Sequence, residues 1–420
     1  MMLLAVFLLL FFGYGLTSAR LDKTVVTAPM LFTAAGMLAC SIAPASLRGG
    51  SASEVFLPAA ELGLVLLLFT DASRTDLSAL VRARSLPSRL LGIGMLLTLL
   101  LGALLARWIF PAFTWGEAGV LAAILAPTDA GLGQVIVEDP RVPVRIRRAL
   151  SVEAGLNDGL SVPFLLFFLA LVETGTSPHH AGLLRLILEQ LGYGVLVGLG
   201  IGLAGGLLLE RSQRRGWTSP RLAPLAVVAL PLLCLVVSEA VEASMFIAAF
   251  VAGLAVQVGS KAAGKHTVEF TEQWGQVVNL AVFFLFGLIA ARAMPSVRAE
   301  HVAYAILSLT VVRMLPVGIA LLGAGLHPAT VLFLGWFGPR GLASIVLGLV
   351  YIEARGHVPD EDTIRLTVAT TVLLSILAHG LTARPGIGLY VRRLDAWGPG
   401  APEREAASAP DPSAVAPHAS

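Results

Sequence analysis

Residues 124–158 read ILAPTDAGLGQVIVEDPRVPVRIRRALSVEAGLND, and this stretch decides the fold. It holds two polar pairs, Thr128-Asp129 and Asn157-Asp158, each inside an otherwise apolar segment. An aspartate at the centre of a bilayer costs about 2.5–3.5 kcal/mol even on a lenient insertion scale. Each carboxylate should therefore face a protein interior or a water-filled cavity and have a partner. The stretch predicts a membrane protein that moves ions.

Composition supports the same class. The 420 residues are 56% hydrophobic and 13% charged, whereas soluble proteins average about 25% charged residues. Cys40 and Cys234 lie far apart in apolar segments, so they suggest neither a disulfide nor a thiolate metal site. The net charge of +2 gives no reason to expect nucleic-acid binding. We see no nucleophile constellation or metal-ligand set, and we expect no enzyme activity and no cofactor.

Long apolar segments predict an all-α integral membrane protein with about thirteen spans, each near 20 residues. The approximate limits are Met2–Leu16, Val26–Ile42, Val55–Thr70, Leu90–Phe110, Ala118–Val137, Ala149–Val172, Leu183–Leu209, Leu222–Val237, Ser244–Val258, Val277–Ala293, Val302–Leu322, Ala329–Ile352 and Ile364–Leu381. The first segment lacks the basic start of a secretory signal and runs into a second apolar segment, so we interpret it as a membrane helix.

The distribution of Lys and Arg among the loops predicts the orientation, because basic residues concentrate on the cytoplasmic side. One set of alternate loops carries Arg20, Lys23, Arg74, Arg82, Arg84, Arg89, Arg141, Arg145, Arg147, Arg148, Arg211, Arg214, Arg215, Arg221, Lys261, Lys265, Arg384, Arg392 and Arg393. The opposite loops carry Arg48, Arg107, Arg292, Arg298 and Arg355. We therefore expect the amino terminus outside, the carboxyl terminus inside and an odd number of spans, in the cell (inner) membrane.

Two units are predicted along the chain. Residues 1–397 form the transmembrane domain. Residues 398–420 are rich in Pro, Ala and Ser without apolar periodicity, which is typical of a disordered cytoplasmic tail.

The fifth and twelfth spans are both interrupted near their middles, by Ala126-Pro127-Thr128-Asp129 and by Gly338-Pro339-Arg340-Gly341. They lie seven spans apart, so the two interrupted helices run in opposite directions. Opposed broken helices indicate an inverted repeat with a binding site where they cross.

Other motifs are weaker. Residues 200–205, GIGLAG, match a dinucleotide fingerprint, but no strand precedes them and they lie in an apolar span. A small-residue stripe at Gly194, Gly198, Gly202 and Gly206 favours close packing against a neighbouring helix. The eight histidines are scattered and form no helical metal-ligand pair.

The sixth span carries the chemistry. Glu153 and Asn157 are four residues apart and share a helix face, whereas Asp158 is turned by about 100° from Asn157. One face can therefore be structural while the next faces an ion. We predict that Asp158 binds a cation or a proton in competition.

The break in the fifth span supplies further oxygen atoms. Pro127 ends a half-helix and leaves carbonyl groups free, and Thr128 and Asp129 add a hydroxyl and a carboxylate. Carboxylate, hydroxyl, amide and carbonyl oxygens suit a hard monovalent cation. Asp158, Asn157, Thr128 and Asp129 are thus the candidate site, although Asp129 is equally consistent with a cap on the second half-helix.

Two arginines, Arg313 and Arg340, lie within apolar spans, and either could pair with Glu153. Asp71, at the inner end of the third span, either lines a cytoplasmic entrance or lies in the membrane interface.

Pro127-Thr128-Asp129, Glu153-x-x-x-Asn157-Asp158 and Gly338-x-Arg340-Gly341, in this order, resemble the monovalent cation/proton antiporter superfamily, in particular its Na⁺/H⁺ exchanger branch with an Asn-Asp motif. The resemblance extends to about Arg393 and includes residues 69–72 (FTDA) and 249–253 (AFVAG). The sequence departs from the pattern at Ala154, where many relatives carry a ligating serine, and at Ala130, where proline is common.

The resemblance implies a homodimer with a dimerisation bundle and a core bundle that moves with the ion. It also implies that the carboxylate at Asp158 binds cation or proton, that Thr128 is a ligand, that Glu153 pairs with an arginine such as Arg313, and that Arg340 tunes the crossing.

The favoured function is exchange of one cytoplasmic Na⁺ or Li⁺ for one external proton by alternating access. Asn157 has no titratable charge, so a single carboxylate predicts electroneutral exchange. K⁺/H⁺ antiport on the same scaffold is the alternative, because selectivity depends on cavity geometry and ligand number. A cation channel or a sensor is a further alternative, but the polar residues converge on one cluster rather than along a pore.

Overall fold

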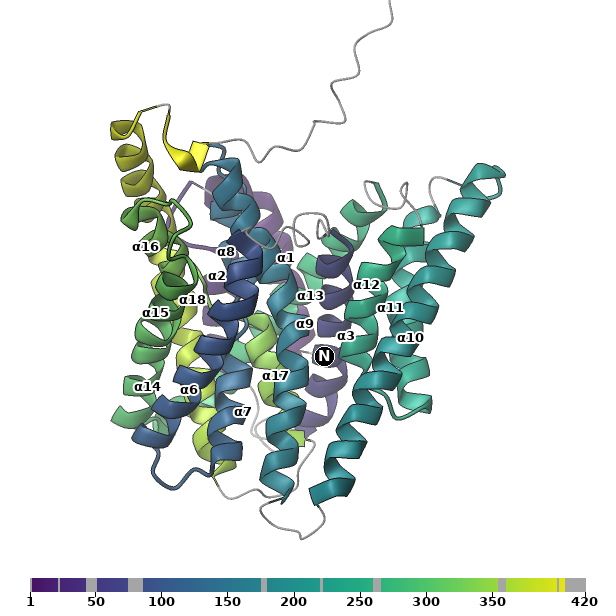
Figure 1. Cartoon of the computed structure of the whole chain (residues 1–420), viewed down its shortest axis with the longest axis horizontal. Helices are drawn as coiled ribbons and strands as arrows, with labels where there is room; N and C mark the ends of the chain where they lie inside the picture. Colours follow the sequence, from purple (N-terminus) through teal and green to yellow (C-terminus); the bar gives the residue numbers. More distant parts are fainter. Residues whose placement is uncertain are drawn as a thin grey trace, which may run out of the picture.

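The computed structural model of the chain describes residues 2–21, 23–42, 51–74, 86–174, 180–219, 222–259, 266–353, 360–398 and 400–404. Within these ranges the regular elements are helices, and no strand occurs. Most helices lie side by side and roughly parallel in one bundle (Figure 1). The predicted all-α fold class is confirmed.

Among the described residues, nine of the predicted spans are single helices. They are α1 (Met2–Leu21), α2 (Ala28–Ile42), α3 (Ser51–Arg74), α9 (Val144–Thr174), α10 (His180–Arg214), α11 (Ala223–Ala240), α12 (Met245–Gly259), α13 (His266–Ala293) and α18 (Glu361–Ala396).

The other four spans are interrupted in the described part of the chain. They consist of α5 (Leu86–Arg89), a π-helical turn (Leu90–Gly94) and α6 (Met95–Ile109); α7 (Trp115–Leu125) and α8 (Ala130–Val137); α14 (Ala299–Leu309) and α15 (Val311–Ala320); and α16 (Pro328–Trp336) and α17 (Leu342–Glu353). The breaks in α7/α8 and α16/α17 lie where the sequence predicts them. The π-helical turn and the break at Thr310 are findings that the sequence pattern does not predict.

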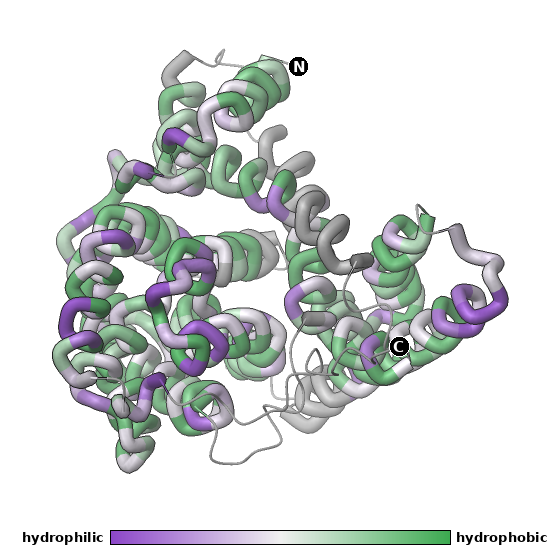
Figure 2. Tube along the Cα trace, turned by 90° about the horizontal axis from the view of Figure 1, so that it is seen from above, coloured by the Kyte–Doolittle hydropathy of each residue, from purple (hydrophilic) through white to green (hydrophobic). Residues whose placement is uncertain are grey.

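Lipid-facing surfaces distinguish this bundle from a soluble one. On α6 the side chains of Leu96, Leu100 and Leu104 are exposed, whereas Leu99 and Ala103 on the opposite face are buried. A helix that is apolar on all sides is typical of a membrane span. Apolar positions accordingly occur on the outside of the bundle as well as in its interior (Figure 2).

In the described residues, eight helices are long and apolar enough to cross a membrane. They cover residues 2–21, 86–109, 144–172, 189–214, 223–240, 275–296, 299–320 and 361–396. Shorter apolar helices, including α7 and α12, accompany them. The chain is a multi-pass membrane protein.

The glycine stripe lies where α10 contacts α12. An added Cβ on Gly198 would lie 2.5 Å from the carbonyl oxygen of Ala248, and one on Gly202 would lie 2.5 Å from that of Ala252. Only glycine permits such close backbone approach at these positions. The stripe therefore has the packing role that the sequence predicts, and α10, α11 and α12 form one side of the bundle (Figure 1).

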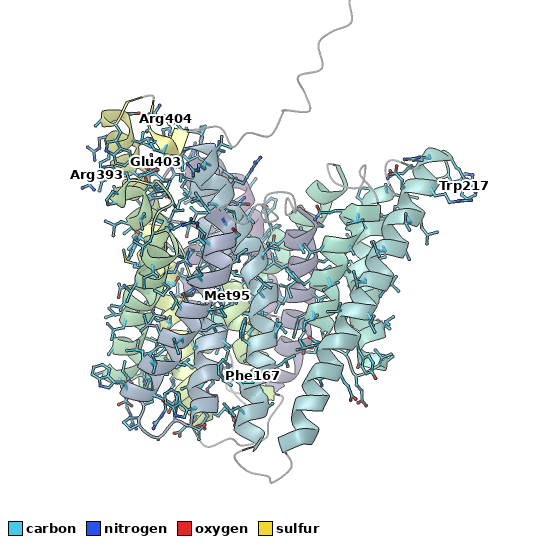
Figure 3. The ribbon with its side chains drawn as sticks, in the orientation of Figure 1. Met95, Phe167, Trp217, Arg393, Glu403 and Arg404 are labelled. Carbon is cyan, nitrogen blue, oxygen red and sulfur yellow. The ribbon has the colours of Figure 1, made fainter. Side chains whose placement is uncertain are left out.

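The carboxyl-terminal segment is ordered further than predicted. Residues 402–404 form a 3₁₀ turn, and Glu403 is buried beside the start of α16, where it accepts hydrogen bonds from His327 N (2.8 Å) and Thr330 Oγ1 (2.9 Å). Glu403 and Arg404 lie at the same end of the bundle as Arg393 (Figure 3). The expected disordered tail therefore cannot begin at residue 398, because a buried carboxylate anchors the chain; residues 405–420 lie outside the described residues.

Candidate functional site

The two broken helices meet at their interruptions. Pro127 and Pro339 each lack the backbone N–H that a continuous helix needs, and both breaks leave helix ends inside the bundle. The Asp129 N–H donates to the Pro339 carbonyl at 2.8 Å, so the two breaks are joined directly through backbone atoms. This contact links segments that are about 210 residues apart in sequence.

Asp129 binds the amino-terminal ends of two half-helices. Its Oδ1 accepts from Leu132 N at 2.9 Å and so caps its own half-helix, α8. Its Oδ2 accepts from Leu342 N at the start of α17. A carboxylate is favourable at a helix amino terminus, where free N–H groups carry partial positive charge. Both oxygens of this buried side chain therefore hold the crossing together.

Arg340 binds the carboxyl-terminal end of α7, as Asp129 binds the amino-terminal ends of α8 and α17. Its Nη1 donates to the carbonyls of Ala126 and Pro127, the latter at 2.9 Å. Its backbone N–H donates to Ser375 Oγ on α18 at 2.7 Å. The side chain is completely buried, and a cation is favourable where helix carbonyls lack intrahelical partners.

Glu153 is paired with Arg313 rather than with Arg340. The Arg313 Nη1 and Nη2 atoms donate to the two carboxylate oxygens, with 2.9 Å between Nη2 and Oε2. Both side chains are at most 5% exposed. The bidentate geometry ties α9 to α15 and satisfies two charges that would be costly to bury alone.

Asp158, Asn157 and Thr128 lie together at the crossing. Asn157 Nδ2 donates to Thr128 Oγ1 at 2.7 Å, which joins α9 to the first break. Asp158 Oδ1 and Asn157 Oδ1 are buried and have no hydrogen-bond partner among the described residues. Unsatisfied buried oxygens cost about 1–3 kcal/mol each and call for a proton, a water or a cation as partner.

A cavity of about 220 Å³ leads toward these residues. Its wall includes Asp71, Thr128, Asp129, Ala154 and Gly155, and it continues past Gln134 to Glu138 at the end of α8. Asp158 lies on α9 about one helical turn beyond Ala154 and Gly155, which line the cavity. The volume holds several waters at about 30 Å³ each.

Ala154 lines the cavity where the antiporter pattern has serine, and Ser151 lines it one turn earlier on α9. Gln276 and Asn279 of α13 also line it. The sequence reading missed these amides, although both are polar residues at the edge of a predicted span.

The donor set around the cavity consists of carboxylate, hydroxyl, amide and carbonyl oxygens. In the part of the chain that the structure describes, no three His, Cys, Asp or Glu side chains come together as a metal-binding group. Hard oxygen ligands of this kind suit a dehydrated or partly hydrated alkali cation.

Comparison with known proteins gives related transporters. The K(+)/H(+) antiporter NhaP of Alkalimonas amylolytica is 25% identical over 375 residues, which cover 87% of this chain and 63% of that protein. The sodium, potassium, lithium and rubidium/H(+) antiporter of Bacillus subtilis is 26% identical over 265 residues, or 63% of this chain and 39% of that protein. The chain thus spans less than two thirds of the length of these relatives.

Among solved structures, the sodium proton antiporter MjNhaP1 from Methanocaldococcus jannaschii, determined at pH 8, has the same fold. Its TM-score is 0.73 at 21% identity, and the match covers 90% of this chain and 99% of that one. The profile of the sodium/hydrogen exchanger transmembrane family matches residues 6–387. Because this match covers most of the sequence, the chain belongs to the sodium/hydrogen exchanger family.

Proposed function

We propose that the chain is a secondary active antiporter that exchanges a monovalent cation for protons by alternating access. The observation that carries the proposal is Asp158: a buried carboxylate with an unpartnered oxygen, next to Asn157, whose amide binds Thr128 in the wall of a cavity lined by oxygen donors. A proton and a cation can compete for that oxygen, and competition at one carboxylate couples their movements. The family and the fold are those of transporters and support this role over an enzyme.

Thr128 and Asn157 are the proposed neighbours of the ion. The Asn157 amide orients the Thr128 hydroxyl at 2.7 Å and leaves its own Oδ1 without a partner, so both side chains can offer an oxygen. The carbonyls of the break add further oxygens, although Arg340 already engages those of Ala126 and Pro127. Asp71 lies on the route from the cavity mouth.

Exchange can be measured in everted membrane vesicles. After respiration acidifies the lumen, adding Na⁺, Li⁺ or K⁺ should dissipate the proton gradient. Asp158→Asn should abolish this response while leaving expression and thermal stability unchanged. Asp362→Asn, an exposed acid on α18, is the matched control and should exchange normally. Cation-dependent proton flux in the Asp158→Asn protein would overturn the proposed site.

We propose electroneutral exchange of one cation for one proton. Asn157 cannot titrate, and both Asp129 oxygens are already engaged by backbone N–H groups at the helix crossing, so neither is free to carry the cation. Asp158 is then the single carrier. In proteoliposomes with a clamped pH gradient, reversing a K⁺-valinomycin potential should leave the Na⁺ flux unchanged, and a flux that follows the potential would contradict this stoichiometry.

Na⁺ or Li⁺ is the proposed cation, with K⁺ as the second candidate. The relative from Alkalimonas amylolytica is named as a K⁺/H⁺ antiporter, which favours the second candidate. With Ala154 in place of the serine of the antiporter pattern, the cavity wall has one side-chain oxygen fewer. A site with fewer fixed ligands discriminates less against a larger ion such as K⁺. Comparing half-saturation concentrations for Na⁺, Li⁺ and K⁺ in the vesicle assay decides between them.

Orientation and assembly complete the proposal. Glu138, in the cavity wall, lies just before Arg141 and the arginines at the start of α9 (Arg145, Arg147 and Arg148), which the distribution of basic residues assigns to the cytoplasm. The site would then face inward. A homodimer in the cell membrane is proposed from the family resemblance, and the mass of the purified protein in detergent, measured by light scattering, tests it.

A further inference from the structure

Four half-helix ends meet at the crossing, and side chains bind all of them. Asp129 caps the amino termini of α8 and α17, and Arg340 binds the carbonyl end of α7. The remaining end is the carboxyl terminus of α16. There the Trp336 carbonyl lies 2.9 Å from Nε2 of His379, a residue of α18 that neither the family motif nor the proposed ion site includes.

His379 is buried, with 2% of its surface exposed, and both of its ring nitrogens have partners. Nδ1 lies 3.1 Å from Ser375 Oγ and 2.9 Å from the Ser375 carbonyl, one turn back on α18. Ser375 Oγ in turn accepts the Arg340 backbone N–H at 2.7 Å. The two side chains, four residues apart on one helix face, therefore bind both sides of the second break.

Each ring nitrogen faces a carbonyl oxygen at 2.9 Å, Nε2 that of Trp336 and Nδ1 that of Ser375, so each tautomer of the neutral ring has a carbonyl to which it can donate. In the tautomer with its hydrogen on Nε2, the ring donates to Trp336 and Nδ1 is an acceptor. The Ser375 hydroxyl already accepts from Arg340, so its own proton is available for Nδ1. The result is a continuous chain from Arg340 N–H through Ser375 and His379 to Trp336.

The charged side chains near His379 are two arginines, Arg340 and Arg313, and Arg313 is already paired with Glu153. An imidazolium would add a further positive charge to this buried region without a counter-ion. It would also displace the Ser375 proton from Nδ1 and break the chain that reaches Arg340.

We propose that His379 is a positioning residue that, through Ser375, fixes the second break and with it the oxygen atoms around the cation. Arg340 is held by its backbone N–H and in turn holds the carbonyls of Ala126 and Pro127 beside Thr128. Groups that orient the ligands of an ion typically change its affinity about 10- to 100-fold when removed. This inference rests on the proposed exchange function.

The contrary interpretation is that His379 only fills space against Trp336, whose ring centroid is 5.1 Å away. The two interpretations differ for two substitutions. Leu fills a similar space but can neither donate nor accept. Gln can donate to Trp336 and accept from Ser375, as the imidazole does.

The test compares His379→Leu with His379→Gln in the vesicle assay. His379→Leu should raise the half-saturation concentration for the cation about tenfold or more, and His379→Gln should stay within about threefold of the wild type. Ser375→Ala should resemble His379→Leu, and combining the two should add little, because both break the same chain. His301→Leu is the matched control, since His301 is equally buried but binds Arg298 N at the start of α14; its half-saturation concentration should not change.

Hydrogen exchange of residues 337–341 provides a readout that does not depend on transport. His379→Leu should speed amide exchange in this segment, whereas His379→Gln and His301→Leu should not. Unchanged exchange and unchanged half-saturation in His379→Leu would overturn the proposal, as would a His379→Gln protein as impaired as His379→Leu. A wild-type protein without cation-dependent proton flux would instead refute the proposed function, and the hydrogen-exchange comparison would still test the positioning role.

Discussion

The two broken helices are alike in backbone and unlike in chemistry. Each is interrupted at a proline, and each provides a charged residue that binds the ends of the other. However, the first break lines the cavity with the polar side chains Thr128 and Asp129, whereas the second lines it with Phe337 and Pro339. The inverted repeat therefore determines where helix ends meet, and sequence differences assign the ion ligands to one repeat.

The assignment of charges follows from helix direction. The second break presents the amino terminus of α17 to Asp129, and the first presents the carboxyl terminus of α7 to Arg340. An anion and a cation are thus each placed where the backbone favours them. Substitutions that alter one break or its support, with the other break or a surface position as the reference, test this difference.

The largest effect is expected behind the second break, at the Glu153–Arg313 pair. A Cβ on Gly338 would lie 2.2 Å from Arg313 Nε, so this ion pair also packs against the break. Glu153→Ala and Arg313→Ala should each lower the free energy of unfolding by about 3–5 kcal/mol, because each leaves a buried charge unpaired. The double substitution should cost less than the sum, as thermal unfolding in detergent will show.

The exposed pair of Arg365 and Asp362 on α18 is the control for this cycle. Its removal should cost at most about 1 kcal/mol, because water screens surface pairs. Strict additivity of the Glu153 and Arg313 substitutions would mean that the two charges do not depend on each other.

Asp129→Asn should have the next largest effect. The asparagine side chain has one acceptor oxygen, so its amide must face either Leu132 N–H or Leu342 N–H, donor against donor. An unsatisfied buried donor costs about 1–3 kcal/mol, which a thermal shift assay can detect. Asp362→Asn, whose side chain is 80% exposed on α18, is the surface control. A stable Asp129→Asn protein with altered charge movement would instead assign Asp129 a carrier role.

Much of the fold could be predicted from sequence because its signals are local. A run of apolar residues predicts a span, and a proline or glycine pair beside a polar residue predicts a break, without knowledge of the neighbours. All predicted spans coincide with described helices or half-helix pairs. The π-helical turn and the break at Thr310 lack such a local signal.

The site depends on long-range contacts, which spacing does not reveal. Arg313 and Arg340 are equally plausible partners of Glu153 by depth, and only the folded arrangement of α15 and α9 brings the Arg313 side chain to it. The sequence indicates that Asp129 can cap α8, but its second contact, with Leu342 N, is 213 residues away. In the sequence, His379 is one of eight scattered histidines, and only the position of α18 beside the second break shows its contact with Trp336.

Glycine substitutions compare the steric demands of the breaks. A Cβ on Gly341 would lie 2.0 Å from Asp129 Oδ2, so Gly341→Ala should displace the shared carboxylate. We expect a loss of about 1–3 kcal/mol from overpacking. Gly133→Ala in α8 meets nothing within 4 Å and should be neutral or stabilise by up to about 1 kcal/mol. Equal effects of the two substitutions on thermal unfolding would contradict this asymmetry.

The smallest effect is expected from single hydroxyl groups, and it tests most directly which break carries the ion. Thr128→Ala removes the acceptor of the Asn157 amide and one candidate ligand, whereas Thr128→Ser keeps both. One neutral hydrogen bond contributes about 0.5–1.5 kcal/mol. Cation affinity should therefore fall about two- to tenfold in Thr128→Ala and stay at the wild-type value in Thr128→Ser. Ser344 in α17 is the counterpart beside the second break: its buried Oγ has no hydrogen-bond partner among the described residues. Ser344→Ala should leave the half-saturation concentration unchanged, because Ser344, unlike Thr128, does not line the cavity. A loss of affinity in Ser344→Ala equal to that in Thr128→Ala would mean that both repeats contribute oxygens to the ion, and the chemical difference between the two breaks would no longer hold.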